Sequence, residues 1–183
     1  MTAAVILAAG ASTRLGEPKQ LVRLGGETLL ERAVRVAREA GCEPVVVVLG
    51  AEAERVLAAC DLRGARVVRN EQWREGMASS VRVGVAAADG ADGVVLMTCD
   101  QPAVTADHLR VLMASGAVTA SAYSGRRGVP AYFPASCFAE LMRLTGDAGA
   151  RELLREASVI DLPGGELDVD TEADQSKAMK RFG

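Results

Sequence analysis

The chain has 183 residues, of which 49% are hydrophobic and 25% are charged, and its formal net charge is −3. This length suits one domain with a sizeable core, and the hydrophobic content excludes a disordered chain. The slightly acidic balance excludes a non-specific nucleic-acid binder and a basic membrane-surface protein. No apolar stretch is long enough to span a bilayer, and the N-terminus lacks the basic region of a signal peptide, so we expect a cytoplasmic protein.

The first half of the chain alternates between Val-rich apolar runs and amphipathic segments. The apolar runs predict strands at Ala4–Ala8, Pro44–Leu49, Ala65–Val68 and Gly93–Thr98. The amphipathic segments predict helices at Thr28–Ala40, Ala51–Ala59 and Met77–Ala88. Continuous apolar strands separated by helices are typical of a parallel sheet that is covered on both faces.

The second half is less regular. Strands are predicted at Val118–Tyr123 and Val129–Phe133, on either side of a turn at Gly125–Gly128. Helices are predicted at Pro134–Leu144, Ala148–Ala157 and Thr171–Arg181. No repeat or low-complexity linker divides the chain. We therefore expect a single α/β domain over residues 1–183, Rossmann-like, with three α/β/α layers and a mostly parallel central sheet.

A loop of small residues follows the first predicted strand. The strand end and the loop together form residues 6–21, Ile-Leu-Ala-Ala-Gly-Ala-Ser-Thr-Arg-Leu-Gly-Glu-Pro-Lys-Gln-Leu. Small residues let backbone N–H groups approach an anion, and Arg14 and Lys19 add two positive charges. The P-loop and dinucleotide patterns both fail, because the glycines are spaced differently and Ser12 and Leu15 stand where glycine is required. The loop predicts a site for the triphosphate of a nucleotide; a plain turn through small residues is the alternative.

Carboxylates follow two later strand-like segments. Asp100 comes directly after the fourth predicted strand, where it could hold Mg²⁺, a cation that prefers oxygen ligands and bound phosphates. A turn or a helix cap is the alternative. Asp168 and Asp170 end the last strand-like stretch, where alternation would place them on one face, and either could complete the site, with Asp170 favoured. The following Thr171–Asp174 also reads as a capping box.

Three further segments carry polar or glycine-rich patterns. Gly76 begins a predicted helix. Its free N–H groups and the hydroxyls of Ser79 and Ser80 could bind the edge of a base or a phosphate. The alternative is a helix cap with Trp73 packed against it. The segments 125–130 and 146–151 could line an acceptor pocket, where Arg127 and Arg151 would suit an anionic acceptor. Taken alone, surface turns and a helix cap explain these two segments better.

The cysteines and the single histidine predict no chemistry. Cys42, Cys60, Cys99 and Cys137 are scattered without metal-ligand spacing, so we expect them to be small buried apolar side chains. His108 lies in the helical-looking segment Asp107–Arg110 and is predicted to be on the surface.

Taken together, these motifs resemble the nucleotidyltransferase family, and most closely its molybdenum cofactor cytidylyltransferase branch. The resemblance covers nearly the whole chain and rests on the motifs at residues 7–20, 70–81, 99–102, 128–130, 146–151 and 168–171. Val129 stands where the family often has His, a departure that concerns the acceptor more than catalysis. Ala9 stands where guanylyltransferase relatives usually carry Gly, which favours cytidine.

The resemblance implies a fold like that of nucleotide-diphospho-sugar transferases and a Mg²⁺-dependent reaction. CMP would pass from CTP, or another NTP would serve as donor, to the phosphate of molybdopterin, with release of pyrophosphate. Residues 1–102 would bind the NTP, and the remainder would bind the acceptor and supply the second metal ligand. A molybdenum hydroxylase or its maturation factor is the implied partner. The alternatives are transfer to a sugar or alditol phosphate, guanylyl transfer to molybdenum cofactor, and a cofactor-delivery chaperone without catalysis.

The implied roles fall on positions that match the family motifs. The catalytic residues are Arg14, Lys19 and Asp100. The nucleotide-binding residues are Leu7, Ala8, Ala9, Gly10, Ser12, Arg14, Lys19, Gly76, Ser79 and Ser80. The metal ligands are Asp100 and Asp170, with Asp168 as the alternative to Asp170. The acceptor-binding residues are Gly128, Pro130, Asp147 and Arg151.

Overall fold

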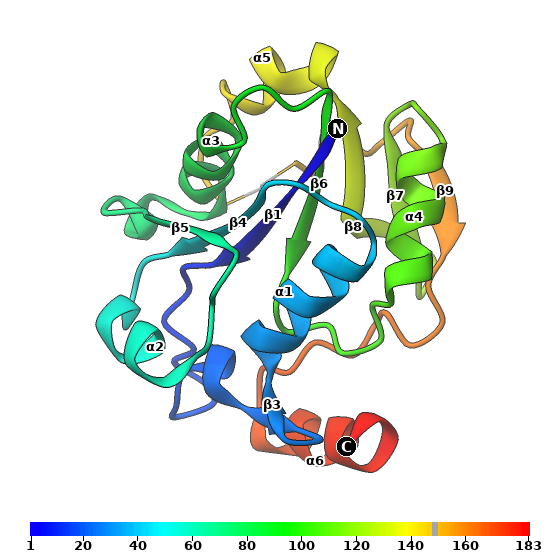
Figure 1. Ribbon diagram of the computed structural model, residues 1–183. Coiled ribbons are helices and arrows are strands. Elements are labelled where there is room, and N and C mark those ends of the chain that lie inside the picture. Colours follow the sequence, from blue (N-terminus) through cyan, green and yellow to red (C-terminus); the bar gives the residue numbers. More distant parts are fainter. Residues whose placement is uncertain (148–149) are drawn as a thin grey trace.

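The apolar runs of the chain form a seven-stranded sheet in the order β5-β4-β1-β6-β8-β7-β9 (Figure 1). The structure is a computed structural model that describes residues 1–147 and 150–183. Strand β1 (Thr2–Ala8) pairs in parallel with β4 (Val45–Leu49) and β6 (Gly93–Thr98), and β4 pairs in parallel with β5 (Arg66–Arg69). The four strands predicted in the first half are confirmed.

The other half of the seven-stranded sheet contains β8, its only antiparallel strand among the described residues. Strand β8 (Arg126–Pro134) runs antiparallel to both β6 and β7 (Thr119–Tyr123), and β9 (Ser158–Asp161) pairs in parallel with β7. β7 and β8 confirm the predicted pair. The helix predicted over Ala148–Ala157 is wrong where it can be judged, because residues 150–156 form turns. Ala148 lies outside the described residues.

Helices cover both faces of the sheet, as predicted. On one face lie α1 (Leu29–Glu39), α2 (Ala53–Ala59) and α4 (Ala106–Ala114). On the other lie α3 (Met77–Ala87) and the short α5 (Phe138–Leu141), which follows a 3₁₀ turn at Ala135–Cys137. Side chains of β1 alternate between the two cores, because successive residues of a strand point to opposite faces. The sheet is therefore the middle of three layers.

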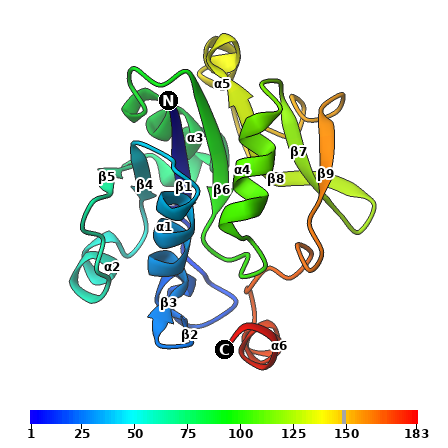
Figure 2. The ribbon, with the colours of Figure 1, turned by 45° about the vertical axis from the view of Figure 1, so that its right-hand side comes forward.

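A third, smaller apolar cluster lies beyond the end of β1 and holds the two ends of the chain together. It joins the loop after β1 and the hairpin of β2 (Arg23–Leu24) and β3 (Glu27–Thr28) to α6 (Glu172–Phe182). Its buried members are Leu15, Val22, Leu24, Leu29, Val169 and Ala178. Figure 2 shows the segment after β9 crossing from the far edge of the sheet to α6, which lies at the opposite end of the molecule from α5.

The segment before α6 differs from the prediction in one respect. Residues 168–170 form a loop rather than the end of a strand, so the expected strand alternation of Asp168 and Asp170 is wrong. The capping box is confirmed: the Thr171 hydroxyl accepts a hydrogen bond from the Asp174 backbone N–H, and the Asp174 carboxylate accepts one from the Thr171 N–H.

The cysteines and membrane expectations have simple outcomes. All four cysteines are free thiols; Cys42 and Cys99 are buried as predicted, whereas Cys60 and Cys137 are half-buried. No helix among the described residues is long and apolar enough to cross a membrane.

The surface prediction for His108 is wrong. His108 is buried on the inner face of α4 with Leu109 and Leu112, and its Nε2 lies 2.7 Å from the Ser121 Oγ. The Ser121 hydroxyl donates to the Pro130 carbonyl oxygen at 2.6 Å, so its oxygen must accept from His108 Nε2–H. The buried imidazole is therefore the neutral Nε2–H tautomer, and burial lowers its pKa.

This burial predicts a pH-dependent stability. The unfolded chain protonates its histidine near pH 6.5, whereas the folded chain does so only at lower pH, so stability should fall as pH decreases below about 6.5. His108→Gln should reduce this fall, because glutamine can still donate to Ser121 and carries no titrating group. Urea unfolding at pH 7 and pH 5 measures the effect, and the difference between the two proteins isolates His108. Parallel stability curves for the two proteins would contradict this interpretation.

Candidate active site at the carboxyl ends of the parallel strands

Three segments of the chain come together beyond the carboxyl ends of β1 and β6. The strand order reverses between β1 and β6, and ligands of open α/β sheets bind at such a crevice, beyond the carboxyl ends of the strands. The loop after β1 supplies Arg14 and Lys19, the end of β6 supplies Asp100, and the segment before α6 supplies Asp170. The loop after β1 and the two carboxylates therefore lie together.

Lys19 is the centre of this cluster. Its ammonium group contacts the Asp100 carboxylate and lies 3.0 Å from Asp170 Oδ1, while Arg14 reaches Asp170 Oδ2 at 3.0 Å. Burial alone would lower the pKa of Lys19, but the negative charge and hydrogen bonding of Asp100, together with the hydrogen bond to Asp170, raise it above its usual value. Lys19 is therefore positively charged at neutral pH and joins two carboxylates that are distant in sequence.

The backbone explains how Asp170 reaches Asp100. The Val169 N–H donates to the Asp100 carbonyl oxygen at 2.9 Å, and the Val169 side chain is fully buried in the third apolar cluster. The residues on either side of Val169, Asp168 and Asp170, are therefore held beside Asp100.

The carboxylates fit a hard cation. Burial raises the pKa of Asp168 to about 6, and the negative charges of Asp100 and Asp170 add to this rise. Among the described residues, no ready-made group of three or more His, Cys, Asp or Glu ligands is present. Mg²⁺ commonly uses one or two carboxylates and completes its shell with water and substrate phosphates, which is what Asp100 and Asp170 could offer.

The side chain of Gln20 holds the loop after β1 in place through hydrogen bonds. The sequence had assigned no role to this residue. Gln20 is completely buried, and its Nε2 donates to the carbonyl oxygens of Ala8 at 2.7 Å and Gly10 at 3.2 Å. The Ser12 Oγ accepts a hydrogen bond from the Lys19 N–H at 2.9 Å and closes the loop. No hydrophobic period marks a buried glutamine, so the sequence offered no signal for it.

A small cavity of about 140 Å³ opens between this loop and the segment before α6. It is lined by Gly10, Ser12, Thr13, Arg14, Leu15, Lys19, Val169 and Asp170. Four of the ten predicted nucleotide-binding residues therefore line one cavity together with a candidate metal ligand. Leu7, Ala8 and Ala9, predicted to bind the nucleotide, are buried at the end of β1 and the start of the loop.

The start of α3 lies beside the loop at residues 146–147. Gly76 has φ +108°, and a Cβ at this position would lie 2.7 Å from the Gly146 carbonyl group. The Ala78 N–H donates to the Gly146 oxygen at 3.1 Å, so the predicted acceptor residue Asp147 lies next to the predicted nucleotide-binding Gly76. Gly149 of the same motif lies outside the described residues.

The two serines of α3 are held by a buried asparagine. Asn70 Nδ2 donates to Ser79 Oγ at 2.7 Å and to Ser80 Oγ at 2.9 Å, and Ser79 Oγ donates to the Gly76 carbonyl at 2.8 Å. The hydroxyl of Ser79 thus fixes the helix start. Trp73, three residues before Gly76, packs against Gly50 after β4, where a Cβ would lie 2.7 Å from the Trp73 Cβ. The helix-cap interpretation therefore accounts for part of this motif.

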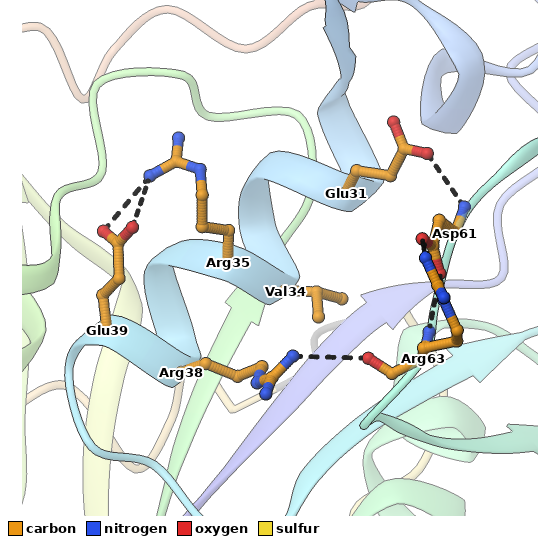
Figure 3. Close-up of a pocket in the computed structure, with 7 residues that line it drawn as sticks. All are labelled: Glu31, Val34, Arg35, Arg38, Glu39, Asp61 and Arg63. Atoms are coloured by element: carbon orange, nitrogen blue, oxygen red, sulfur yellow. Dashed lines mark hydrogen bonds and ion pairs between the residues drawn. The ribbon is translucent and has the colours of Figure 1, made fainter.

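A larger cavity than this one lies elsewhere on the molecule. A groove of about 670 Å³ lies over the outer side of α1 and the segment 61–63 (Figure 3). Figure 3 shows that residues lining the groove bond to one another. Arg35 forms an ion pair with Glu39 at 3.1 Å, and Arg38 donates a hydrogen bond to the Arg63 carbonyl at 3.4 Å. Because these polar groups already bond to one another across the helix surface, the groove is not the candidate active site. That site is the crevice beyond the carboxyl ends of the parallel strands.

Comparison with known proteins agrees with this geometry. The family model described as MobA-like NTP transferase domain matches residues 4–161. The crystal structure of Rv0371c in complex with manganese, from Mycobacterium tuberculosis H37Rv, is 34% identical with a TM-score of 0.81, and the match covers 99% of each chain.

Two curated relatives bear different names. Nicotine blue oxidoreductase of Paenarthrobacter nicotinovorans is 39% identical, over 83% of this chain and 80% of that protein. A probable molybdenum cofactor guanylyltransferase of Opitutus terrae is 42% identical over 57% of this chain, and the match spans half of that relative.

The role of Gln20 leads to a stability prediction. Gln20→Leu should lower the free energy of unfolding by about 1–3 kcal/mol, because the buried Ala8 carbonyl and the Gly10 carbonyl lose their donor. Gln175→Leu, at a half-exposed position of α6, is the control and should change stability by less than about 0.5 kcal/mol. Urea unfolding measures both variants. A Gln20→Leu protein as stable as the control would show that the loop does not depend on this side chain.

Proposed function

As the chain belongs to the MobA-like NTP transferase family and is a nucleotidyltransferase, we propose that it transfers CMP from CTP to the terminal phosphate of molybdopterin or molybdenum cofactor. Pyrophosphate is the second product, and Mg²⁺ is the metal. The observation that carries the proposal is the meeting of Lys19 with Asp100 and Asp170 at the crevice between β1 and β6. This meeting of an ammonium group with two carboxylates supports a site that would bind a triphosphate and a metal.

The reaction requires positioning and charge neutralisation rather than a covalent intermediate. A phosphate oxygen of the acceptor attacks the α-phosphorus of CTP in line, a new P–O bond forms, and the bond to the pyrophosphate oxygen breaks. Arg14 and Lys19 bind the triphosphate and stabilise the charge that grows on the leaving pyrophosphate. No histidine is needed, which agrees with the buried position of His108.

Asp100 and Asp170 would hold the metal. When bound, Mg²⁺ would neutralise phosphate charge and orient the triphosphate oxygens. The manganese found with Rv0371c supports a divalent cation in this family and leaves the choice of Mg²⁺ as part of the proposal.

The nucleotide base would lie between the Leu7–Gly10 backbone and the start of α3. Gly76 and Ser80 border this place, and Ala9 favours cytosine through the family resemblance. Residues 1–102 would thus form the nucleotide half of the site, whereas the remainder supplies Asp170 and the acceptor residues Gly128, Pro130, Asp147 and Arg151. Guanylyl transfer is the alternative, because one relative bears a guanylyltransferase name.

The molybdopterin acceptor rests on that relative and on the motif resemblance. A molybdenum hydroxylase or its maturation factor would then receive the product in the cytoplasm. The oxidoreductase name of the other relative points to a different chemistry, but the loop after β1 lacks the dinucleotide fingerprint at Ser12 and Leu15. Transfer to a sugar or alditol phosphate is a further alternative to be tested.

A product assay tests the proposal. The protein, Mg²⁺ and molybdopterin are incubated with CTP, GTP, ATP or UTP, and pyrophosphate and the dinucleotide product are measured. We expect one pyrophosphate per dinucleotide, with CTP as the best donor. A preference for GTP would correct the base, transfer only to a sugar or alditol phosphate would correct the acceptor, and no pyrophosphate with any pair would refute the proposal.

Removing either central charge should abolish most of the activity. Lys19→Ala and Asp100→Ala should each lower the rate of transfer by about 10²–10³-fold, as for other groups that stabilise transition-state charge. Lys177→Ala, an exposed lysine of α6, is the matched control and should keep the wild-type rate. Thermal melting of each variant separates catalytic loss from unfolding. Turnover of either variant near that of wild type would contradict the assigned roles.

The two C-terminal carboxylates should differ in their effect on metal dependence. Asp170 lines the loop cavity and contacts Lys19 and Arg14, whereas Asp168 does not line it. Asp170→Ala should therefore raise the Mg²⁺ concentration for half-maximal rate more than Asp168→Ala does. The reverse order would assign the second metal ligand to Asp168.

A further inference from the structure

The β7–β8 hairpin brings a second group of side chains to the edge where Asp100 lies. β8 runs antiparallel to β6, so the turn between β7 and β8 falls at the end of the sheet where β6 terminates. Tyr123, the last residue of β7, and Arg126, the first of β8, flank this turn. Neither residue was singled out in the sequence.

Tyr123 is tied to the residue that follows Asp100. Gln101 Nε2 donates to the Tyr123 hydroxyl at 3.2 Å and to the Gly165 carbonyl at 3.1 Å, and the Tyr123 hydroxyl donates to the Val129 carbonyl at 3.0 Å. A side chain at Gly128 would collide with this hydroxyl. The ring of Tyr123 is therefore held in place next to Asp100, and Gly128 serves by leaving room for it.

The two arginines of the hairpin have different surroundings. Arg127 is turned away from this edge, because its Nε donates to the Ala157 carbonyl at 3.1 Å. The Arg126 guanidinium lies over the Tyr123 ring, 5.6 Å from its centre. Within the described part of the chain, Arg126 forms no ion pair. The positively charged Arg126 therefore lies at the β7–β8 hairpin, near the end of β6 that carries Asp100, and has no anionic partner among the described residues.

We infer that Arg126 binds the phosphate of the acceptor, so that the acceptor is a phosphate monoester that enters over the β7–β8 hairpin. The inference rests on the proposed function, because it names the group that meets the attacking phosphate. Lys19 and Arg14 bind the triphosphate on the β1 side of Asp100, and Arg126 holds the second phosphate on the β8 side. Guanidinium groups suit this task, since they donate paired hydrogen bonds to phosphate oxygens.

Equilibrium binding of molybdopterin tests the inference, with a non-hydrolysable CTP analogue and Mg²⁺ present. Arg126→Gln should weaken binding by about 10–100-fold, in line with the loss of a charge-assisted phosphate contact. Arg127→Gln is the matched control and should bind as wild type. Affinity for the CTP analogue and the melting temperature should stay unchanged in both variants.

Dephosphorylated molybdopterin supplies the second arm. The wild type should bind it as weakly as Arg126→Gln binds the intact compound, and Arg126→Gln should weaken its binding no further. The inference is overturned if Arg126→Gln binds molybdopterin as wild type does, if Arg127→Gln weakens binding equally, or if the wild type does not bind molybdopterin. Arg126-dependent binding without pyrophosphate release would instead refute the proposed function and leave this inference standing.

Discussion

One lysine ammonium shared by two carboxylates holds the candidate site together. Lys19 comes from the loop after β1, Asp100 from the end of β6, and Asp170 from the segment before α6. These three parts of the chain meet only because the third apolar cluster packs the C-terminal segment under the N-terminal loop. Burying an ion pair costs desolvation free energy, and burying one of its charges without the partner costs more. The apolar cluster, which brings the partners together, and the ion pairs therefore stabilise one another.

The same arrangement suits the proposed substrates. A triphosphate would offer Lys19 new anionic partners, and a divalent cation would offer new positive charge to Asp100 and Asp170. In the proposed bound state one set of ion pairs would replace another, and no buried charge would lose its partner. Such an exchange keeps the desolvation cost of binding low while the charges stay where the reaction needs them.

Neutral amides form a supporting layer behind these charges. Gln20 holds the loop after β1, Asn70 holds the serines of α3, and Gln101 holds Tyr123. Each is buried and bonds to backbone carbonyls or hydroxyls. Amides fix positions without adding charge, so they orient the site and do not compete with phosphates or metal. Preorganisation of this kind accounts for much of the catalytic power of sites that stabilise charge.

The sequence predicted what depends on local pattern and missed what depends on distant contacts. The continuous apolar runs specified the parallel strands, and Asp100 was found because it directly follows one of them. Ser158–Asp161 was missed because this edge strand is mostly exposed and carries no apolar run. His108 was misplaced because charged neighbours hide the inward face of α4. Gln20 is buried by tertiary packing alone, which no residue period reveals.

The crystal structure of the protein with CTP, Mg²⁺ and a non-reacting acceptor phosphate is the most direct test of this account. We predict that Lys19 leaves the carboxylates for the triphosphate, while Asp100 and Asp170 bind the metal. Nucleotide bound elsewhere, such as in the groove over α1, or a Lys19 still bridging both carboxylates beside bound CTP and metal, would contradict it.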